Sequence, residues 1–289
     1  MKNWITFTKE RFPLIDHTLM IVLFVSAHLI LVAPSIEVIN SICIFAAIYL
    51  FFFKMRLYDE IKDYELDCEI NPDRPLPRGL LTISDVKKGI ISCIILEIAL
   101  FIPLGTIPLI AIVVAIAYSL LMYKEFFIGK LIRPHLTTYA LLHTIVTVPM
   151  GLAIFVGSTG LSYDNLSRDN WYFVFSSWFV FNIFEFGRKT FTSNEERNAV
   201  ESYSKIFTRF GAVLLVNVMS FSALYMLFHI QESVSIAQSI LTLTLFIIGV
   251  IFSISDKEKF GKIYRLYSSI YIILFYIIFI IEIKTGFLL

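Results

Sequence analysis

Nine apolar runs, each long enough to cross a lipid bilayer, dominate this sequence. A hydrocarbon core about 30 Å thick requires about 17 to 25 mostly apolar residues in a helix. The runs extend approximately over residues 17–33, 36–53, 88–104, 106–123, 135–157, 169–186, 210–230, 234–253 and 263–283. They are continuous rather than alternating, which argues against a β-barrel. The sequence therefore predicts an all-α, multi-span transmembrane bundle of nine helices, forming a single domain over residues 1–289.

The composition agrees with lipid as the surrounding solvent. Hydrophobic residues make up 57% of the chain and charged residues only 16%, with a mean hydropathy of +0.78. An average globular chain is roughly a quarter charged. A net charge of +1 gives no reason to expect a nucleic-acid partner. Cys43, Cys68 and Cys93 are far apart and form no CxxC pair, so neither a disulfide framework nor a zinc site is predicted.

The basic residues predict the orientation of the spans. If the N-terminus is cytoplasmic, the cytoplasmic segments are residues 1–17, 54–88, 124–134, 187–209 and 254–265. These segments contain 22 of the 24 Lys and Arg residues, and only Arg168 and Lys284 lie on the other side. Positive charge is retained on the cytoplasmic side during insertion. We therefore expect an integral multi-pass protein, with residue usage compatible with a bacterial inner membrane.

The first acidic loop, residues 56–81, carries aspartates at a regular spacing. Asp59, Asp63 and Asp67 recur every four residues, so in a helix they form one ridge. Stacked carboxylates repel each other unless a cation lies among them, and Mg²⁺ prefers carboxylate and phosphate oxygens. Arg74 and Arg78 follow in a proline-rich turn, and arginine suits phosphate oxygens. The alternative is a solvated loop whose acids and bases pair with one another.

The stretches DEIKDYELD and NPDRPLPRG resemble the first signature of the UbiA superfamily of intramembrane prenyltransferases. That signature has an asparagine, aspartates four and eight residues later, and an Arg-Pro-rich turn. On this match Asp63 and Asp67 take the aspartate positions and Arg74 the arginine position, while Asp59 replaces the asparagine. Nine spans, with acidic loops after the second and sixth, also match the superfamily. The resemblance implies a cavity capped by the two cytoplasmic acidic loops.

The second signature of the superfamily is a pair of aspartates four residues apart at the end of the sixth span. Here Glu185 fits the first position, but the second falls on Lys189. Glu195, Glu196 or Glu201 can complete a second metal site, or Arg188 and Lys189 can contact the diphosphate directly. The alternative is an ion pair between Glu185 and Lys189 on one helix face.

Further polar residues lie near the ends of the fourth, fifth and sixth spans. The superfamily often has a tyrosine and a lysine four residues apart after the fourth span, but here Leu120 precedes Lys124 at that offset. His135, Tyr139 and His143 share one face of the fifth span, where a histidine can position an acceptor, accept a proton or serve packing alone. Glu97, Asn217 and Glu282 have no visible partner.

The resemblance implies a Mg²⁺-dependent prenyltransferase that moves an isoprenyl group from a prenyl diphosphate to an aromatic or other lipophilic acceptor. The expected catalytic residues are Asp63, Asp67 and Glu185. The expected metal ligands are Asp59, Asp63, Asp67, Glu185, Glu195 and Glu196. The expected diphosphate ligands are Arg74, Arg78, Lys124, Arg133, Arg188 and Lys189. The expected acceptor or cavity residues are Asn182, Tyr118, His135, Tyr139 and His143.

Two other functions stay open. A membrane terpene cyclase of the same superfamily keeps the ionisation step but closes a ring instead of prenylating an acceptor. A lipid transporter instead requires charged residues along a path through the spans, whereas here the charges concentrate in the loops. An alcohol-phosphatidyl transferase is disfavoured, because no D-G-x-x-A-R stretch is present.

Overall fold

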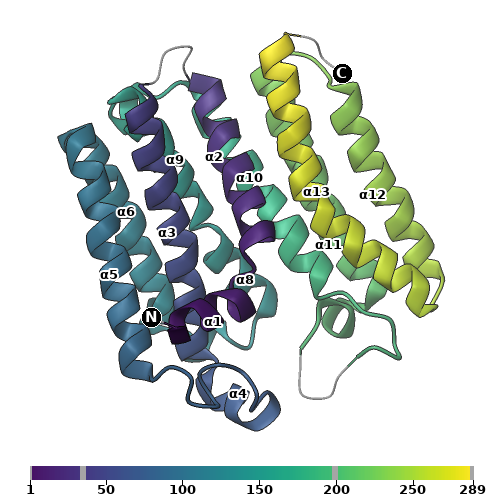
Figure 1. Ribbon diagram of the computed structural model, residues 1–289. Coiled ribbons are helices and arrows are strands. Elements are labelled where there is room, and N and C mark those ends of the chain that lie inside the picture. Colours follow the sequence, from purple (N-terminus) through teal and green to yellow (C-terminus); the bar gives the residue numbers. More distant parts are fainter. Residues whose placement is uncertain (1, 33–36, 197–200, 287–289) are drawn as a thin grey trace.

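The computed structural model describes residues 2–32, 37–196 and 201–286, and no strand occurs among them. The α-helices, which are shown in Figure 1, are α1 (Lys2–Arg11), α2 (Leu14–Val32), α3 (Val38–Lys62), α4 (Tyr64–Ile70), α5 (Ile83–Phe101), α6 (Thr106–Tyr123), α7 (Gly129–Ile132), α8 (Leu136–Thr144), α9 (Thr147–Thr159), α10 (Arg168–Arg188), α11 (Tyr203–Gln231), α12 (Ile236–Ile254) and α13 (Glu258–Thr285). Short 3₁₀ turns, residues 102–104, 125–127 and 163–165, complete the described part.

The prediction of an all-α membrane bundle is confirmed, but nine is wrong as the number of helices. Short helices α1, α4 and α7 lie outside the apolar runs, and the fifth run is divided into α8 and α9. This division has a local cause at Pro149, which has no N–H to donate to the carbonyl of Ile145. The apolar runs otherwise coincide with α2, α3, α5, α6 and α10–α13.

Seven helical segments of the described chain are long and apolar enough to cross a membrane. They are α2, α3, α6, α8 together with α9, α11, α12 and α13. The two other long helices are more polar: α5 includes Asp85, Lys87, Lys88 and Glu97, and α10 has charged residues near both ends. The chain is an integral membrane protein, and these two helices depend on neighbouring helices to bury their polar groups.

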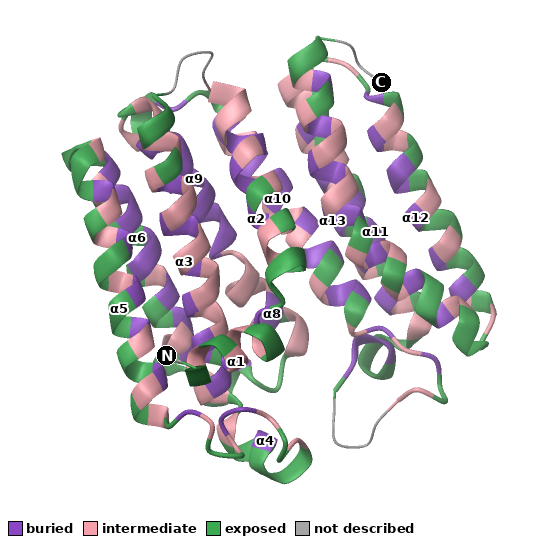
Figure 2. Ribbon diagram, in the orientation of Figure 1, coloured by how far each residue is buried: buried purple, intermediate pink, exposed green. Residues whose placement is uncertain are grey.

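The bundle has two groups of helices joined through α2. Helices α3, α5, α6 and α9 contact one another in the first group, and α10–α13 do so in the second. Helix α2 contacts both α9 and α13, and α9 also contacts α10 (Figure 1). Large apolar side chains such as Ile95 and Phe210 are exposed on the outer surface, while buried residues lie between the helices (Figure 2). This pattern fits a bundle surrounded by lipid.

The junction of the two groups is packed with aromatic rings. Phe24 of α2 lies 5.7 Å from Phe181 of α10 and 6.0 Å from Tyr276 of α13, measured between ring centroids. Phe173 stacks on Phe279 at 4.3 Å. Most aromatic residues here therefore serve packing, as edge-to-face and offset-stacked pairs do in other helical cores.

A buried ion pair joins α3 and α5. Lys54 Nζ lies 2.5 Å from Glu97 Oε2, and both side chains are 0% exposed. The sequence shows no visible partner for Glu97, and the structure provides one in Lys54. Glu282 likewise has partners, because it accepts hydrogen bonds from Gln231 and Ser235.

Most of the charged loops gather at one end of the bundle, which we call the charged end. It consists of the described residues of 54–88, 124–134, 187–209 and 254–265. Helix α1 lies across this end beside the first acidic loop (Figure 1). Asn3 Nδ2 donates to Leu80 O at 2.9 Å, which attaches α1 to that loop. The loops predicted to lie on one side of the membrane therefore do lie together.

A candidate diphosphate site at the charged end

The aspartate ridge of the first acidic loop keeps its helical spacing across the junction of α3 and α4. Asp63 terminates α3 with φ −89° and ψ 0° and also precedes the first residue of α4. Its backbone N–H donates to Asp59 O at 2.9 Å, and Asp67 N–H donates to Asp63 O at 2.8 Å. Because these are i to i+4 bonds, the three side chains follow one another along the chain at one-turn intervals, as the sequence predicts.

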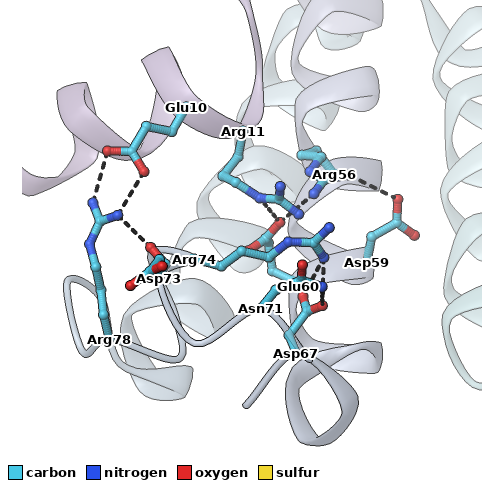
Figure 3. Close-up of polar contacts among 10 residues, drawn as sticks. All are labelled: Glu10, Arg11, Arg56, Asp59, Glu60, Asp67, Asn71, Asp73, Arg74 and Arg78. Carbon is cyan, nitrogen blue, oxygen red and sulfur yellow. Dashed lines mark hydrogen bonds and ion pairs between the residues drawn. The ribbon is translucent and has the colours of Figure 1, made fainter. Parts of the chain in front are cut away.

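Asp67 is held in place by Arg74 and Asn71. Arg74 Nη1 lies 2.6 Å from both carboxylate oxygens of Asp67, and Asn71 Nδ2 donates to Oδ1 at 3.0 Å (Figure 3). The Asp67 side chain is only 4% exposed. Two residues that the resemblance assigns to metal and to diphosphate therefore bind each other and hold the proline-rich turn against α4.

Asp59 and Asp63 are the open carboxylates of the ridge. The Asp59 side chain is 53% exposed and its nearest basic group, Arg56 Nη1, is 3.9 Å away. No side chain among the described residues donates a hydrogen bond to the carboxylate of Asp63, which is exposed. The surrounding protein removes part of its water and Asp67 adds negative charge, so the pKa of Asp63 is raised above its ordinary value.

A second set of ion pairs attaches this loop to α1. Arg11 Nε and Arg56 Nη2 each lie 2.6 Å from Glu60 Oε1 (Figure 3). Arg78 donates to both carboxylate oxygens of Glu10, at 3.0 and 2.8 Å. Arg78, an expected diphosphate ligand, therefore lies on the α1 side of the loop, where it stabilises the turn.

In the second acidic loop, residues 185–201, Glu185 is fully engaged by basic side chains. Arg188 Nε donates to Glu185 Oε2 at 2.8 Å, and Lys189 Nζ lies 2.8 Å from Oε1. The predicted alternative, an ion pair between Glu185 and Lys189, is therefore present. The helix end is held against α13 by a close approach at Gly187, where a Cβ would collide with the side chain of Ser268.

Glu195 and Glu196 fold the second acidic loop onto itself and onto α13. Arg265 donates to Glu195 Oε2 at 2.9 Å and to Oε1 at 2.5 Å, and Thr192 Oγ1 donates to Oε2 at 2.8 Å. Glu196 accepts hydrogen bonds from Ser202 Oγ at 2.7 Å and from Ser204 Oγ at 2.6 Å. The hydrogen bond from Arg265 is the main reason that the pKa of Glu195 is lowered to about 2.

The Glu195–Arg265 ion pair predicts a pH-dependent stability. A lowered pKa contributes stability that is complete above the ordinary value of 4.5 and is lost as the pH falls toward about 2. The difference in melting temperature between the wild type and Glu195→Gln should be constant from pH 8 to about pH 5 and should shrink below about pH 4.5. Glu258→Gln, which removes an exposed pair with Lys262, is the control and should change little. A difference that persisted undiminished at pH 3 would contradict this assignment.

Lys62 joins the first acidic loop to α8, and the sequence did not single it out. Its Nζ lies 2.6 Å from Tyr139 Oη and 3.0 Å from His143 Nε2. His143 Nδ1 is 2.7 Å from Tyr139 O, so the neutral Nδ1–H tautomer donates there and Nε2 accepts from Lys62. The expected common face of Tyr139 and His143 is confirmed by their ring stacking at 3.9 Å. A role as proton acceptor would require His143 to release Lys62.

A strained turn after α6 brings Glu125 toward the same cluster. Glu125, Phe126 and Phe127 have φ values of 51°, 55° and 59°, which for non-glycine residues cost about 1–3 kcal/mol each. The turn buries Glu125. Arg133 Nε donates hydrogen bonds to both of its carboxylate oxygens, at 3.0 and 2.8 Å, and Tyr139 Oη donates another at 3.3 Å. Burial opposes ionisation of Glu125, but the hydrogen bond and charge of Arg133 outweigh it and lower the pKa.

Charge–charge interactions connect the two acidic regions. Asp59 interacts with Arg188 at the end of α10, and His143 interacts with Glu185. Asp63 also interacts with Arg133. The ends of α3 and α10, the strained turn and α8 therefore surround one mixed acidic and basic cluster.

Four further expected residues either hydrogen-bond within the bundle or are exposed. Tyr118 Oη donates to Leu142 O at 2.8 Å. Asn182 accepts from Thr144 Oγ1 at 2.8 Å and donates to Trp178 O at 2.8 Å, which packs α10 on α8. Lys124 is exposed with its Nζ 5.1 Å from the ring of Tyr123, and His135 is exposed at the start of α8.

The first acidic loop suits a hard divalent cation only with help from a ligand. No group of three or more His, Cys, Asp or Glu side chains in the described chain is arranged to hold a metal. Asp59 and Asp63 offer two open carboxylates on consecutive turns. Mg²⁺ is commonly bound by one or two carboxylates together with waters and substrate phosphate oxygens. The residues present therefore fit Mg²⁺ held jointly with a diphosphate.

Four hollows on the described surface are lined by residues other than the open carboxylates. They have volumes between about 230 and 460 Å³. The one of 460 Å³ is lined by Phe179, Asn217 and Phe221 among others, and none of the four is lined by Asp59, Asp63 or Glu185. A cavity capped by the two acidic loops stays a prediction.

Comparison with solved structures identifies the architecture. A UbiA homolog from Aeropyrum pernix K1 in its apo form superimposes with a TM-score of 0.67 and 17% identity, over 94% of this chain and 98% of the other. The chain has the UbiA fold. A digeranylgeranylglyceryl phosphate synthase has a TM-score of 0.69 and 15% identity, over 99% of this chain and all of the other. Comparisons with family models and with curated proteins find no match. The UbiA resemblance inferred from the stretches DEIKDYELD and NPDRPLPRG is therefore confirmed at the level of the fold.

Proposed function

We propose that this protein is an intramembrane prenyltransferase that transfers an isoprenyl group from a prenyl diphosphate to a lipophilic or aromatic acceptor. The observation that carries the proposal is the pair of open carboxylates, Asp59 and Asp63, in electrostatic reach of the basic end of α10. The UbiA fold of the chain supports the same function. One protein of this fold is a digeranylgeranylglyceryl phosphate synthase, by its name an enzyme of isoprenoid lipid synthesis.

The charges of the cluster suit the departure of diphosphate. Asp59 and Asp63 would hold Mg²⁺, and bound Mg²⁺ supplies positive charge to the phosphate oxygens. Arg188 and Lys189 have N–H groups beyond those bound to Glu185, and these would donate to diphosphate oxygens. When the allylic C–O bond breaks, its electron pair stays on the diphosphate oxygen, which these donors stabilise.

Aromatic rings beside the cluster suit the cationic isoprenyl group. Phe126 lies 5.5 Å from Tyr118 and 6.4 Å from His143, measured between ring centroids, and Tyr139 stacks on His143. The faces of such rings attract a cation. The reaction also requires that water be excluded once the substrate is bound, because water would hydrolyse the cation. We also propose that the charged end faces the cytoplasm, since its basic residues would be retained there.

The rival reaction is a cyclisation without an acceptor, favoured by the replacement of the second acidic position by Lys189. The test is to incubate the purified protein in Mg²⁺ with prenyl diphosphates of several chain lengths, with and without a membrane lipid extract and simple phenols. We expect acceptor-dependent pyrophosphate release and a prenylated product detected by mass spectrometry. A cyclic hydrocarbon formed without acceptor would favour the cyclase, and no product from any donor would remove both.

The transporter alternative finds little support in the described spans. The buried ion pair between Lys54 and Glu97 is not accessible to solvent, because both side chains are 0% exposed. It is a single pair between α3 and α5, not a series of sites along a path. A transported ion or headgroup needs accessible polar groups at successive depths.

A further inference from the structure

We propose that the basic end of α10 replaces the second metal ion, so that the site takes one divalent cation and binds the other face of the diphosphate through Arg188 and Lys189. This inference rests on the proposed function, because it concerns how that same site holds a prenyl diphosphate. The resemblance implies a pair of carboxylates at the end of α10, whereas this chain has Glu185 and Lys189 there.

The helix geometry places a base where a second acid would stand. Helix α10 ends at Arg188, and Lys189 is its C-cap residue. Glu185 and Lys189 are one turn apart, on the same face. Two carboxylates at this spacing would attract a cation between them, whereas a carboxylate and an ammonium group neutralise each other.

Of the carboxylates expected at a second metal site, Glu185, Glu195 and Glu196 already have protein partners. Arg188 and Lys189 occupy both oxygens of Glu185. Arg265 occupies both oxygens of Glu195, and serine hydroxyls donate to both oxygens of Glu196. Glu201 is exposed, and no described group of three such side chains is arranged to bind a metal. The described residues of the second acidic loop therefore do not fit a divalent ion.

The same helix end retains donors for an anion. Arg188 is 45% exposed and uses Nε and Nη2 for Glu185, while Lys189 is 29% exposed and has three N–H groups of which Glu185 takes one. Glu185 neutralises one of the two positive charges, so the helix end keeps a net charge of +1. Asp59 and Asp63 at the end of α3 offer carboxylates in place of bases. The two halves of the site therefore have opposite sign.

This asymmetry assigns different tasks to the two halves. The acidic half attracts a cation, and the basic half binds phosphate oxygens without one. Arg188 gives a planar fork suited to two phosphate oxygens, and Lys189 gives a compact charge that can turn from Glu185 to the ligand. The basic half should therefore bind a prenyl diphosphate weakly even when no metal is present.

The first arm of the test counts metal ions. The purified, full-length protein in detergent is titrated with Mn²⁺ in the presence of a non-cleavable prenyl thiolodiphosphate, and bound Mn²⁺ is measured by electron paramagnetic resonance. We expect one Mn²⁺ per chain. Two Mn²⁺ per chain would overturn the proposal and leave the proposed function intact, whereas failure to bind the analogue with any metal would remove both.

The second arm measures the affinity for the same analogue in excess EDTA. Lys189→Ala should weaken this metal-free binding about ten-fold or more, the effect of losing a hydrogen bond to a charged group, and Lys189→Arg should restore it. Lys262→Ala, which removes an exposed lysine of α13, is the matched control. Equal affinities of the wild type and Lys189→Ala, with both proteins monodisperse by gel filtration, would overturn the role of Lys189.

Discussion

Replacing Asp63 by asparagine is expected to lower the rate of Mg²⁺-dependent pyrophosphate release by about a hundred- to a thousand-fold, without a loss of folding. Asp63 has one of the two open carboxylates of the ridge and accepts no side-chain hydrogen bond from the described residues, so it can serve as a ligand to a metal. Losing one preorganised electrostatic contact to the departing group typically costs that much. The rate is measured by coupled detection of pyrophosphate with a prenyl diphosphate as substrate.

The matched control is Glu65→Gln, which makes the same chemical change on the exposed surface of α4. Its rate should stay within about two-fold of the wild type, as surface substitutions away from such features usually have small effects. Full activity of Asp63→Asn, together with an unchanged melting temperature, would exclude Asp63 from the site. A parallel loss of activity in Glu65→Gln would mean that general charge at this surface matters more than the ridge.

The largest expected effect on stability comes from the buried pair of Lys54 and Glu97. Glu97→Leu alone removes the carboxylate and leaves the Lys54 ammonium group uncompensated in a site with no exposure, at a cost of about 3–5 kcal/mol. The double variant Lys54→Met/Glu97→Leu replaces the pair by apolar groups of similar volume and should unfold near the wild-type temperature. Thermal unfolding of the purified protein in one detergent measures both.

The comparison of single and double variants separates charge from packing. If the single variant were as stable as the wild type, Lys54 would be able to reach water or lipid headgroups, and the pair would not be closed. If the double variant were as unstable as the single one, the loss would come from side-chain shape. Only rescue by the second substitution supports an electrostatic cause.

Local patterns in the sequence predict the helices and the ridge well. The apolar runs follow the bilayer thickness, which any spanning helix must match, so the long helices lie where the runs are. The four-residue spacing of Asp59, Asp63 and Asp67 continues across the junction of α3 and α4 because Asp63 keeps nearly helical backbone angles. Both features depend on neighbours within one or two turns.

Contacts between distant segments decide which charged residues are free, and the sequence does not reveal those contacts. Asp67 and Asp63 look equivalent in the sequence, but the chain turns back at the prolines so that Arg74 binds Asp67 alone. Lys54 and Glu97 are 43 residues apart and meet only because α3 packs on α5. The inward direction of Glu125 depends on three left-handed residues that propensity would not place there.

Lys62 is the functional candidate that the sequence analysis missed, and a signal for it exists. It directly precedes Asp63, so on a helix it points about 100° away from the aspartate ridge, toward another element. That element is α8, whose Tyr139 and His143 were already expected to share one face. Combining the two faces would have predicted the contact.

The central claim is that the open carboxylates and the basic helix end form one site that ionises a prenyl diphosphate. Its most direct measurement is pyrophosphate release by the wild-type protein, reconstituted in lipid vesicles with prenyl diphosphates of several lengths, in Mg²⁺ and in EDTA. We predict release in Mg²⁺ that falls to near background in EDTA and that returns when Mg²⁺ is restored. Absence of release from every donor in Mg²⁺, or release that EDTA leaves unchanged, would contradict it.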